Sequence, residues 1–156
     1  MFEINVLSGV RLARTYMKGM LERGHGRIIF ISSECAVTPM ESMELYCASK
    51  AALLSLARGL ANLTKGTAVT VNTVIPGPTE TDSLKGFIEA TYPDLSYADK
   101  EAELRFLREK RPHSLINRLA QPSEVANVVT FLSSGRASVM NGSIIRAEGG
   151  DIPTVA

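Results

Sequence analysis

The first 23 residues place apolar side chains at alternating steps of four and three, with charged side chains between them. This spacing is typical of an amphipathic helix that buries one face. Gly24 and Gly26 follow, and glycine readily takes the left-handed conformation that ends a helix. The pattern therefore predicts a helix over residues 3–23. Its apolar stripe consists of Val6, Val10, Ala13, Met17 and Met20.

Two shorter segments are apolar without this helical spacing. Residues 27–32 (RIIFIS) and 68–75 (AVTVNTVI) have almost unbroken apolar centres, which suit strands covered on both faces, as in a parallel sheet. A third short strand is expected at 143–147, after the turn residues Asn141 and Gly142. The sequence therefore predicts three strands separated by long connections.

Helical patterns fill those connections. Residues 46–62 are small or apolar nearly all round, so this helix should be covered on every side, within the domain or at a subunit interface. Shorter helices are expected at 85–90, 99–110 and 123–133. The alternation of helices and strands indicates an α/β fold with a parallel sheet and right-handed crossovers.

Composition excludes several functional classes. The 156 residues suffice for one domain with a substantial core, and the net charge of +1 has no basic face for nucleic acid or an anionic membrane. No apolar run approaches the ~18 residues that a membrane span needs. Cys35 and Cys47 fit neither a metal-ligand nor a disulfide spacing, and His25 and His113 are isolated. We expect no metal site and a reducing, cytoplasmic environment.

One pair of residues has the chemistry of a general acid/base. Tyr46 and Lys50 are four apart at the start of a predicted helix, so their side chains lie on one face. A phenol titrates near pH ~10, too high to act at neutrality, and an adjacent ammonium lowers that value. We therefore expect Lys50 to lower the pKa of Tyr46. The pair taken alone is more typical of a packed ring beside a lysine that reaches solvent.

Three further features accompany this pair. Ser33 ends the strand predicted at 27–32, thirteen residues before Tyr46; Asn5 lies in the first helix; and Pro76-Gly77 follows the second strand. Each has an ordinary structural explanation, as a strand end, a helix cap or a turn. Together with Tyr46 and Lys50 they resemble the short-chain dehydrogenase/reductase family, in its classical branch.

The resemblance implies a Rossmann-like, doubly wound parallel sheet. Family members begin with a βαβ unit whose turn, Thr-Gly-x-x-x-Gly-x-Gly, binds the cofactor pyrophosphate at a helix N-terminus. That motif does not occur in this sequence, and Gly24-His25-Gly26 precedes a strand instead of a helix. We therefore expect residues 1–156 to form a single domain that corresponds to the C-terminal part of such a fold, without the nucleotide-binding βαβ half.

The resemblance also implies catalytic roles. Tyr46 would exchange a proton with the substrate oxygen while hydride passes to or from a nicotinamide. Lys50 would lower the Tyr46 pKa and hydrogen-bond the nicotinamide ribose, and Ser33 would stabilise charge on the substrate oxygen. Asn5 would position a water that links Lys50 to solvent. Ser33 is preferred to Ser32 on spacing alone.

The same resemblance implies a cofactor and a substrate class. The cofactor is NAD or NADP, with Tyr46, Lys50, Pro76, Gly77 and Thr79 near its nicotinamide end. The substrate is a small carbonyl compound or secondary alcohol. Residues 79–118 occupy the place of the family's substrate loop, but no substrate contact is assigned there. Four aromatic residues are candidates for the pocket lining: Phe87, Tyr92, Tyr97 and Phe106.

Two functional hypotheses follow. In the first, the chain is the catalytic half of an NAD(P)-dependent oxidoreductase. In the second, it is a truncated, non-catalytic remnant or dimerisation module that binds no cofactor on its own. Helices 3–23 and 46–62 would in either case pair with their counterparts in a homodimer or homotetramer. The strand at 27–32 would become an apolar sheet edge, which is prone to pairing or aggregation.

We predict that the 156-residue chain alone binds NADH and NADPH weakly or not at all, because the pyrophosphate-binding turn does not occur in it. Titration of the purified chain, followed by nucleotide fluorescence, measures this affinity. Micromolar binding of either nucleotide would contradict the prediction.

Overall fold

A three-stranded parallel sheet forms the centre of the structure, a computed structural model that describes residues 1–98 and 100–155. Its strands are β1 (His25–Ile31), β2 (Ala68–Pro76) and β3 (Ile144–Ala147), in the order β1-β2-β3. Both pairings are parallel, so the three predicted strands and their direction are confirmed. Because β2 lies between the other two, it is buried along nearly its whole length.

Polar side chains inside β2 bind the turn that precedes β3. The Asn72 side chain donates a hydrogen bond to the Met140 carbonyl at 2.7 Å and accepts one from the Ser143 N–H at 3.0 Å. A buried amide is costly unless it is hydrogen-bonded, and here its donor and acceptor sides are both used. These two bonds hold the start of β3 beside the centre of β2.

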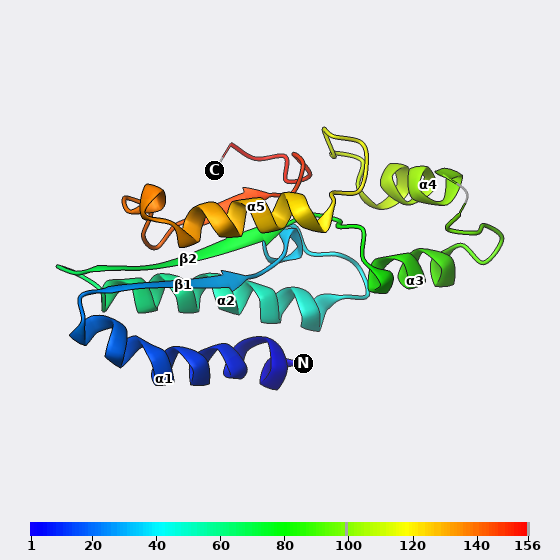
Figure 1. Cartoon of the computed structure of the whole chain (residues 1–156). Coiled ribbons are helices and arrows are strands. Elements are labelled where there is room, and N and C mark those ends of the chain that lie inside the picture. The colour runs from blue at the N-terminus through cyan, green and yellow to red at the C-terminus, as the bar shows by residue number, and fades with distance from the viewer. Residues whose placement is uncertain (99, 156) are drawn as a thin grey trace.

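Helices cover both faces of the sheet (Figure 1). A π-helical turn, Glu3–Leu7, leads into α1 (Ser8–Glu22), and α1 and α2 (Glu44–Asn62) pack on one face. α5 (Pro122–Ser133) packs on the other. The core under α1 and α2 consists of Ala13, Met17, Phe30, Leu53, Ala57, Ala61 and Val71.

Two helices form a separate pair beyond the carboxyl ends of the strands (Figure 1). They are α3 (Asp82–Thr91) and α4 (Lys100–Lys110), which bear out the helices expected at 85–90 and 99–110, although Asp99 lies outside the described residues. α3 begins where the Thr81 hydroxyl accepts a hydrogen bond from the Leu84 N–H, an N-cap. The pair has its own core, consisting of Ile88, Tyr92, Ala102, Phe106, Leu107 and Leu119.

Some boundaries differ from the predictions for local reasons. The helix expected over 3–23 opens with a π-helical turn, in which the Ser8 N–H bonds to the Glu3 carbonyl five residues earlier. β1 begins at His25, two residues before the predicted start, because Gly24 completes the turn at φ +71° and pairing with Ala68 starts there. Within the single chain one side of α2 stays open, with Leu45 64% exposed, so the alternative that a subunit interface covers this helix stays a prediction.

β1 forms an edge of the sheet, as expected. Within residues 1–98 and 100–155 its pairing partner is β2 alone, and Ile31 at its end is 44% exposed. A hollow of about 320 Å³ lies between α1 and this strand. In the same described residues, no helix is long and apolar enough to cross a membrane. These residues also contain no group of three or more His, Cys, Asp or Glu side chains that could hold a metal ion.

The core under α2 yields a test of these packing arguments. Replacing Leu53, which is 3% exposed, with alanine should lower the free energy of unfolding by about 2–5 kcal/mol, because it leaves a cavity. The control is Leu63→Ala at the C-cap of the same helix, where the leucine is 62% exposed and the effect should stay within about 0.5 kcal/mol. Urea unfolding of both variants measures the difference. Equal losses would contradict the packing described here.

Candidate active site

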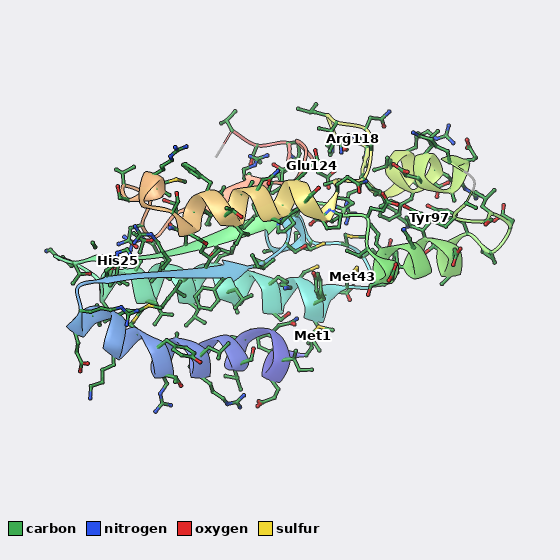
Figure 2. The ribbon with its side chains drawn as sticks, viewed as in Figure 1. Met1, His25, Met43, Tyr97, Arg118 and Glu124 are labelled. Carbon is green, nitrogen blue, oxygen red and sulfur yellow. The ribbon has the colours of Figure 1, made fainter. Side chains whose placement is uncertain are left out.

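Tyr46 and Lys50 occupy the first turns of α2, on the face directed at the end of β1. The Lys50 ammonium donates a hydrogen bond to the Ile31 carbonyl at 3.1 Å and lies 5.6 Å from the centroid of the Tyr46 ring. Met43, the residue before α2 begins, lines the pocket beside them (Figure 2). The spacing of four therefore places the two side chains together, at the carboxyl edge of the sheet.

Ser33 follows β1 and caps a short 3₁₀ turn, Glu34–Ala36. Its hydroxyl accepts a hydrogen bond from the Cys35 N–H at 3.2 Å and donates one to the Glu34 carboxylate at 2.8 Å, and Ser33 lines the same hollows as Tyr46. Ser32 is used differently, because its hydroxyl donates to the Lys50 carbonyl at 2.7 Å and so joins β1 to α2. The structure thus brings Ser33, the serine preferred from the sequence, to the tyrosine.

Asn5 reaches the same helix from the π-helical turn. Its side-chain amide donates to the Ser49 hydroxyl at 2.9 Å, and that hydroxyl donates to the Tyr46 carbonyl at 2.7 Å. Asn5 therefore contacts the backbone of the turn that carries Tyr46, through a serine that the sequence analysis did not single out. Single π-helical turns often occur at functional sites. The water that Asn5 was expected to hold stays a prediction.

Burial dominates the acid–base properties of the site. It raises the pKa of Tyr46 above its usual value, and the hydrogen bond with Ser33 opposes that change. Burial also lowers the pKa of Lys50. The expectation that Lys50 would bring the pKa of Tyr46 below its ordinary value is therefore wrong for the chain alone. The physical reason is that desolvation of the phenolate outweighs its favourable contacts.

The turn after β2 is held tightly beside the same residues. The Gly77 N–H donates to the Ala147 carbonyl at 3.2 Å, and the Thr79 hydroxyl donates to the Gly77 carbonyl at 2.9 Å. A Cβ atom at Gly77 would lie 2.6 Å from the Glu148 carbonyl oxygen, so glycine is required by this close approach. Pro76 is the last residue of β2 and lines the site beside Gly77.

Two adjoining hollows meet at Tyr46, and four residues line both: Ser33, Tyr46, Gly77 and Thr79. One, of about 380 Å³, is also lined by Lys50 and Pro76 and so contains every residue predicted to lie at the nicotinamide end of a cofactor. The second, also about 380 Å³, opens toward α3 and α4. Its apolar lining consists of Cys35, Met40, Met43, Leu84, Phe87 and Phe106.

The four candidate aromatic residues divide into two pairs. Phe87 and Phe106 line the second hollow and contact each other edge to face, with ring centroids 6.4 Å apart. Tyr92 and Tyr97 do not line it. The Tyr92 hydroxyl donates a hydrogen bond to the Glu109 carboxylate at 2.9 Å. The ring of Tyr97 (Figure 2) packs under the ammonium group of Lys85.

Three charged residues at this site were not identified from the sequence. Glu34 and Arg111 form a buried ion pair with an N–O distance of 2.7 Å, and Asp151 lies 3.0 Å from the Arg111 Nε atom. No spacing could have revealed this group, because its members lie far apart in the chain. The one available signal was the position of Glu34, directly after Ser33.

Known proteins are similar to this chain over nearly its whole length. A family model described as enoyl-(acyl carrier protein) reductase matches residues 1–151. The uncharacterized oxidoreductase YvaG of Bacillus subtilis is 48% identical over 154 residues, 99% of this chain and 58% of YvaG. A short-chain type dehydrogenase/reductase of Picea abies is 32% identical over 151 residues, 97% of this chain and 51% of that protein. The chain belongs to the short-chain dehydrogenase/reductase family.

Solved structures of the family agree. L-sorbose reductase from Gluconobacter frateurii, complexed with NADPH and L-sorbose, matches with a TM-score of 0.89 at 34% identity, over 99% of this chain and 57% of that one. The present chain therefore spans just over half the length of these relatives, consistent with a C-terminal portion of a short-chain dehydrogenase/reductase. The predicted fold class, a partial Rossmann-like parallel sheet, is confirmed.

The close approach at Gly77 can be tested with matched alanine substitutions. Gly77→Ala should lower the free energy of unfolding by about 1–3 kcal/mol, because its methyl group overlaps the backbone of Glu148. Gly59→Ala, in the last turn of α2 with open space around it, should instead raise it by about 0.5–1 kcal/mol. Denaturant unfolding compares the two. Effects of the same sign would show that the backbone contact at Gly77 is absent.

Proposed function

We propose that this chain is the catalytic half of an NAD(P)-dependent oxidoreductase, which interconverts a carbonyl compound and a secondary alcohol with Tyr46 as general acid/base. The observation that carries the proposal is the convergence of Ser33, Tyr46 and Lys50 on one hollow beside the turn after β2. Family membership supports the reaction class.

The proton chemistry would follow from the contacts of these groups. Tyr46, with a raised pKa, holds its proton at neutral pH and so suits donation to a carbonyl oxygen during reduction. Ser33 lines the hollow beside the phenol and would meet the substrate oxygen, where its hydroxyl would stabilise developing charge. The Lys50 ammonium donates one hydrogen bond, to the Ile31 carbonyl, and its remaining N–H groups would bind a ribose.

The same hollow fits the reactive end of a nicotinamide nucleotide. Pro76, Gly77 and Thr79 line it. Because glycine has no side chain, the backbone at Gly77 can approach the backbone of Glu148 closely. When bound, the nucleotide would supply or accept the hydride. The solved L-sorbose reductase contains NADPH, which supports a cofactor of this class here. The pocket lined by Phe87 and Phe106 would receive the substrate.

The second hypothesis, an oligomerisation module without catalysis, has its own support. Ile4, Leu12 and Tyr16 are spaced by multiples of four along the first helix, so they share a face, and each is more than half exposed. Leu45 on α2 is equally exposed. An apolar face of this kind suits a homodimer or homotetramer built on α1 and α2. Such an assembly is compatible with an enzyme and with a remnant alike.

Substitution of Tyr46 tests the catalytic proposal. In the longest natural form of the protein, Tyr46→Phe should lower kcat for reduction of small ketones with NADH or NADPH by about 10²–10⁴-fold, because the proton donor is lost. Tyr16→Phe removes the same hydroxyl from an exposed position on α1 and should leave turnover unchanged.

Either of two results would contradict the proposal. Turnover by Tyr46→Phe equal to that of the unsubstituted protein would remove the assigned acid/base. Absence of any turnover by the unsubstituted protein in its longest natural form, identified by intact mass, would favour the oligomerisation module.

A further inference from the structure

The second hollow, which opens from Tyr46 toward α3 and α4, has a lining that is mostly apolar. Its volume of about 380 Å³ falls within the usual range for ligand pockets, ~300–1,000 Å³. Ser33 and Tyr46 lie where it meets the hollow assigned to the nicotinamide. A carbonyl group held between these two side chains would therefore extend one of its substituents into the second hollow.

An aromatic pair forms one wall of this hollow. The rings of Phe87 and Phe106 meet edge to face, with an angle of 85° between their planes. Phe106 is 1% exposed and has the Arg111 guanidinium 5.6 Å from its ring centroid, whereas Phe87 is 41% exposed. The uncovered aromatic surface is therefore that of Phe87. A ligand that covers it gains free energy in proportion to the apolar area buried, and a second ring fits such a surface well.

Two methionines line the hollow as well. Met43 precedes the first turn of α2 (Figure 2). Met40 is held in place because its N–H donates to the Cys47 thiol sulfur at 3.4 Å and its own sulfur lies 2.7 Å from the Arg111 Nη2 atom. Methionine side chains are flexible and polarizable, so they adapt to the outline of an apolar ligand and favour contact with aromatic rings.

The charged groups beside the hollow are already paired. Among the described residues that line it, Arg111 is the one cation. Its Nη2 atom donates to the Glu34 carboxylate at 2.7 Å, its Nη1 atom donates to the Lys110 carbonyl at 2.8 Å, and its Nε atom lies 3.0 Å from the Asp151 carboxylate. A carboxylate or phosphate on a ligand would therefore meet no unpaired cation, and the burial of an unpaired charge is costly.

The threonine hydroxyls of the hollow are bonded to the backbone. The Thr79 hydroxyl donates to the Gly77 carbonyl at 2.9 Å, and the Thr81 hydroxyl accepts from the Leu84 N–H at 3.3 Å. A ligand with many hydroxyl groups would leave most of them without partners here, which is unfavourable. The lining thus disfavours charged and polyhydroxylated substituents alike.

We propose that the second hollow selects uncharged ketones, and the corresponding secondary alcohols, that carry an apolar ring beside the carbonyl carbon. Phe87 is then a specificity-determining residue, because its exposed face is the surface that such a ring covers. The proposal rests on the function proposed above for the reaction itself, whereas the binding preference belongs to the hollow and is measurable without turnover. Acetophenone, a methyl ketone with a phenyl ring, is the simplest member of this class.

Binding is measured first, by NMR of the 156-residue chain with labelled methionine methyl groups. Of its six methionines, Met40 and Met43 line the second hollow, whereas Met17 and Met140 belong to the cores on either side of the sheet. Acetophenone should shift the signals of Met40 and Met43 and leave those of Met17 and Met140 in place. 4-Acetylbenzoate, the same ketone with a carboxylate on its ring, should bind at least about tenfold more weakly.

Turnover is measured next, in the longest natural form with NADH or NADPH. The value of kcat/KM for acetophenone should exceed the values for acetone and for L-sorbose, a polyhydroxylated ketone, by at least about tenfold. Phe87→Ala should lower the ratio of acetophenone to acetone about tenfold, mainly by raising the KM for acetophenone. Phe131→Ala, at a phenylalanine of similar exposure on α5, should leave this ratio unchanged.

Folding of the variant is verified by circular dichroism. If Phe87→Ala does not fold, Phe87→Leu keeps an apolar side chain without the ring and should lower the same ratio to a smaller extent. A ratio that neither substitution changes would overturn the proposal. So would equal affinities for acetophenone and 4-acetylbenzoate, or an absence of shifts at Met40 and Met43. Absence of turnover with every ketone would instead count against the proposed oxidoreductase, and the methionine signals would still decide the preference of the hollow.

Discussion

The parallel pairing of β1 with β2 is the constraint on which the rest of this structure depends. In a parallel sheet the carboxyl ends of neighbouring strands lie at one edge, and ligands of such folds bind there. Ser33 leaves β1 at that edge and Gly77 leaves β2 beside it. Since α2 packs across both strands, its first turns reach the same edge with Tyr46 and Lys50. Packing alone therefore brings separate segments of the chain to one site.

Hydrogen bonds made by two serines then help to position the residues at this edge of the sheet. Ser32 joins the end of β1 to α2 through the Lys50 carbonyl, and Ser49 joins Asn5 to the Tyr46 carbonyl. Neither serine touches the hydroxyl of Tyr46, yet both determine where its ring lies. Small changes in these contacts would move the phenol, because they hold the backbone that carries its ring.

The elements that bury apolar surface could be read from the sequence, because burial leaves a periodic pattern. That is why β2 and α2 could be predicted from their patterns, whereas the placement of Ser33 beside Tyr46 was expected from the resemblance to a known family. The π-helical turn at Glu3–Leu7 leaves no such pattern, since it changes hydrogen bonding and not polarity. The pairing of Glu34 with Arg111 is also invisible, because it joins residues 77 positions apart. The direction of the Tyr46 pKa was missed because it depends on how deeply the ring is buried.

Proton transfer and nucleotide binding are physically separable in this fold. The groups proposed to handle the proton come from the end of β1, from α2 and from the turn after β2, all within a chain that spans just over half the length of its relatives. The Gly-rich turn that would bind a pyrophosphate does not occur in this sequence, and β1 presents an open edge with Ile31 exposed. An intact acid–base site can thus exist in a chain with little affinity for the nucleotide. Ionisation of Tyr46 and cofactor affinity should therefore be measured as independent properties, since either one can be present without the other.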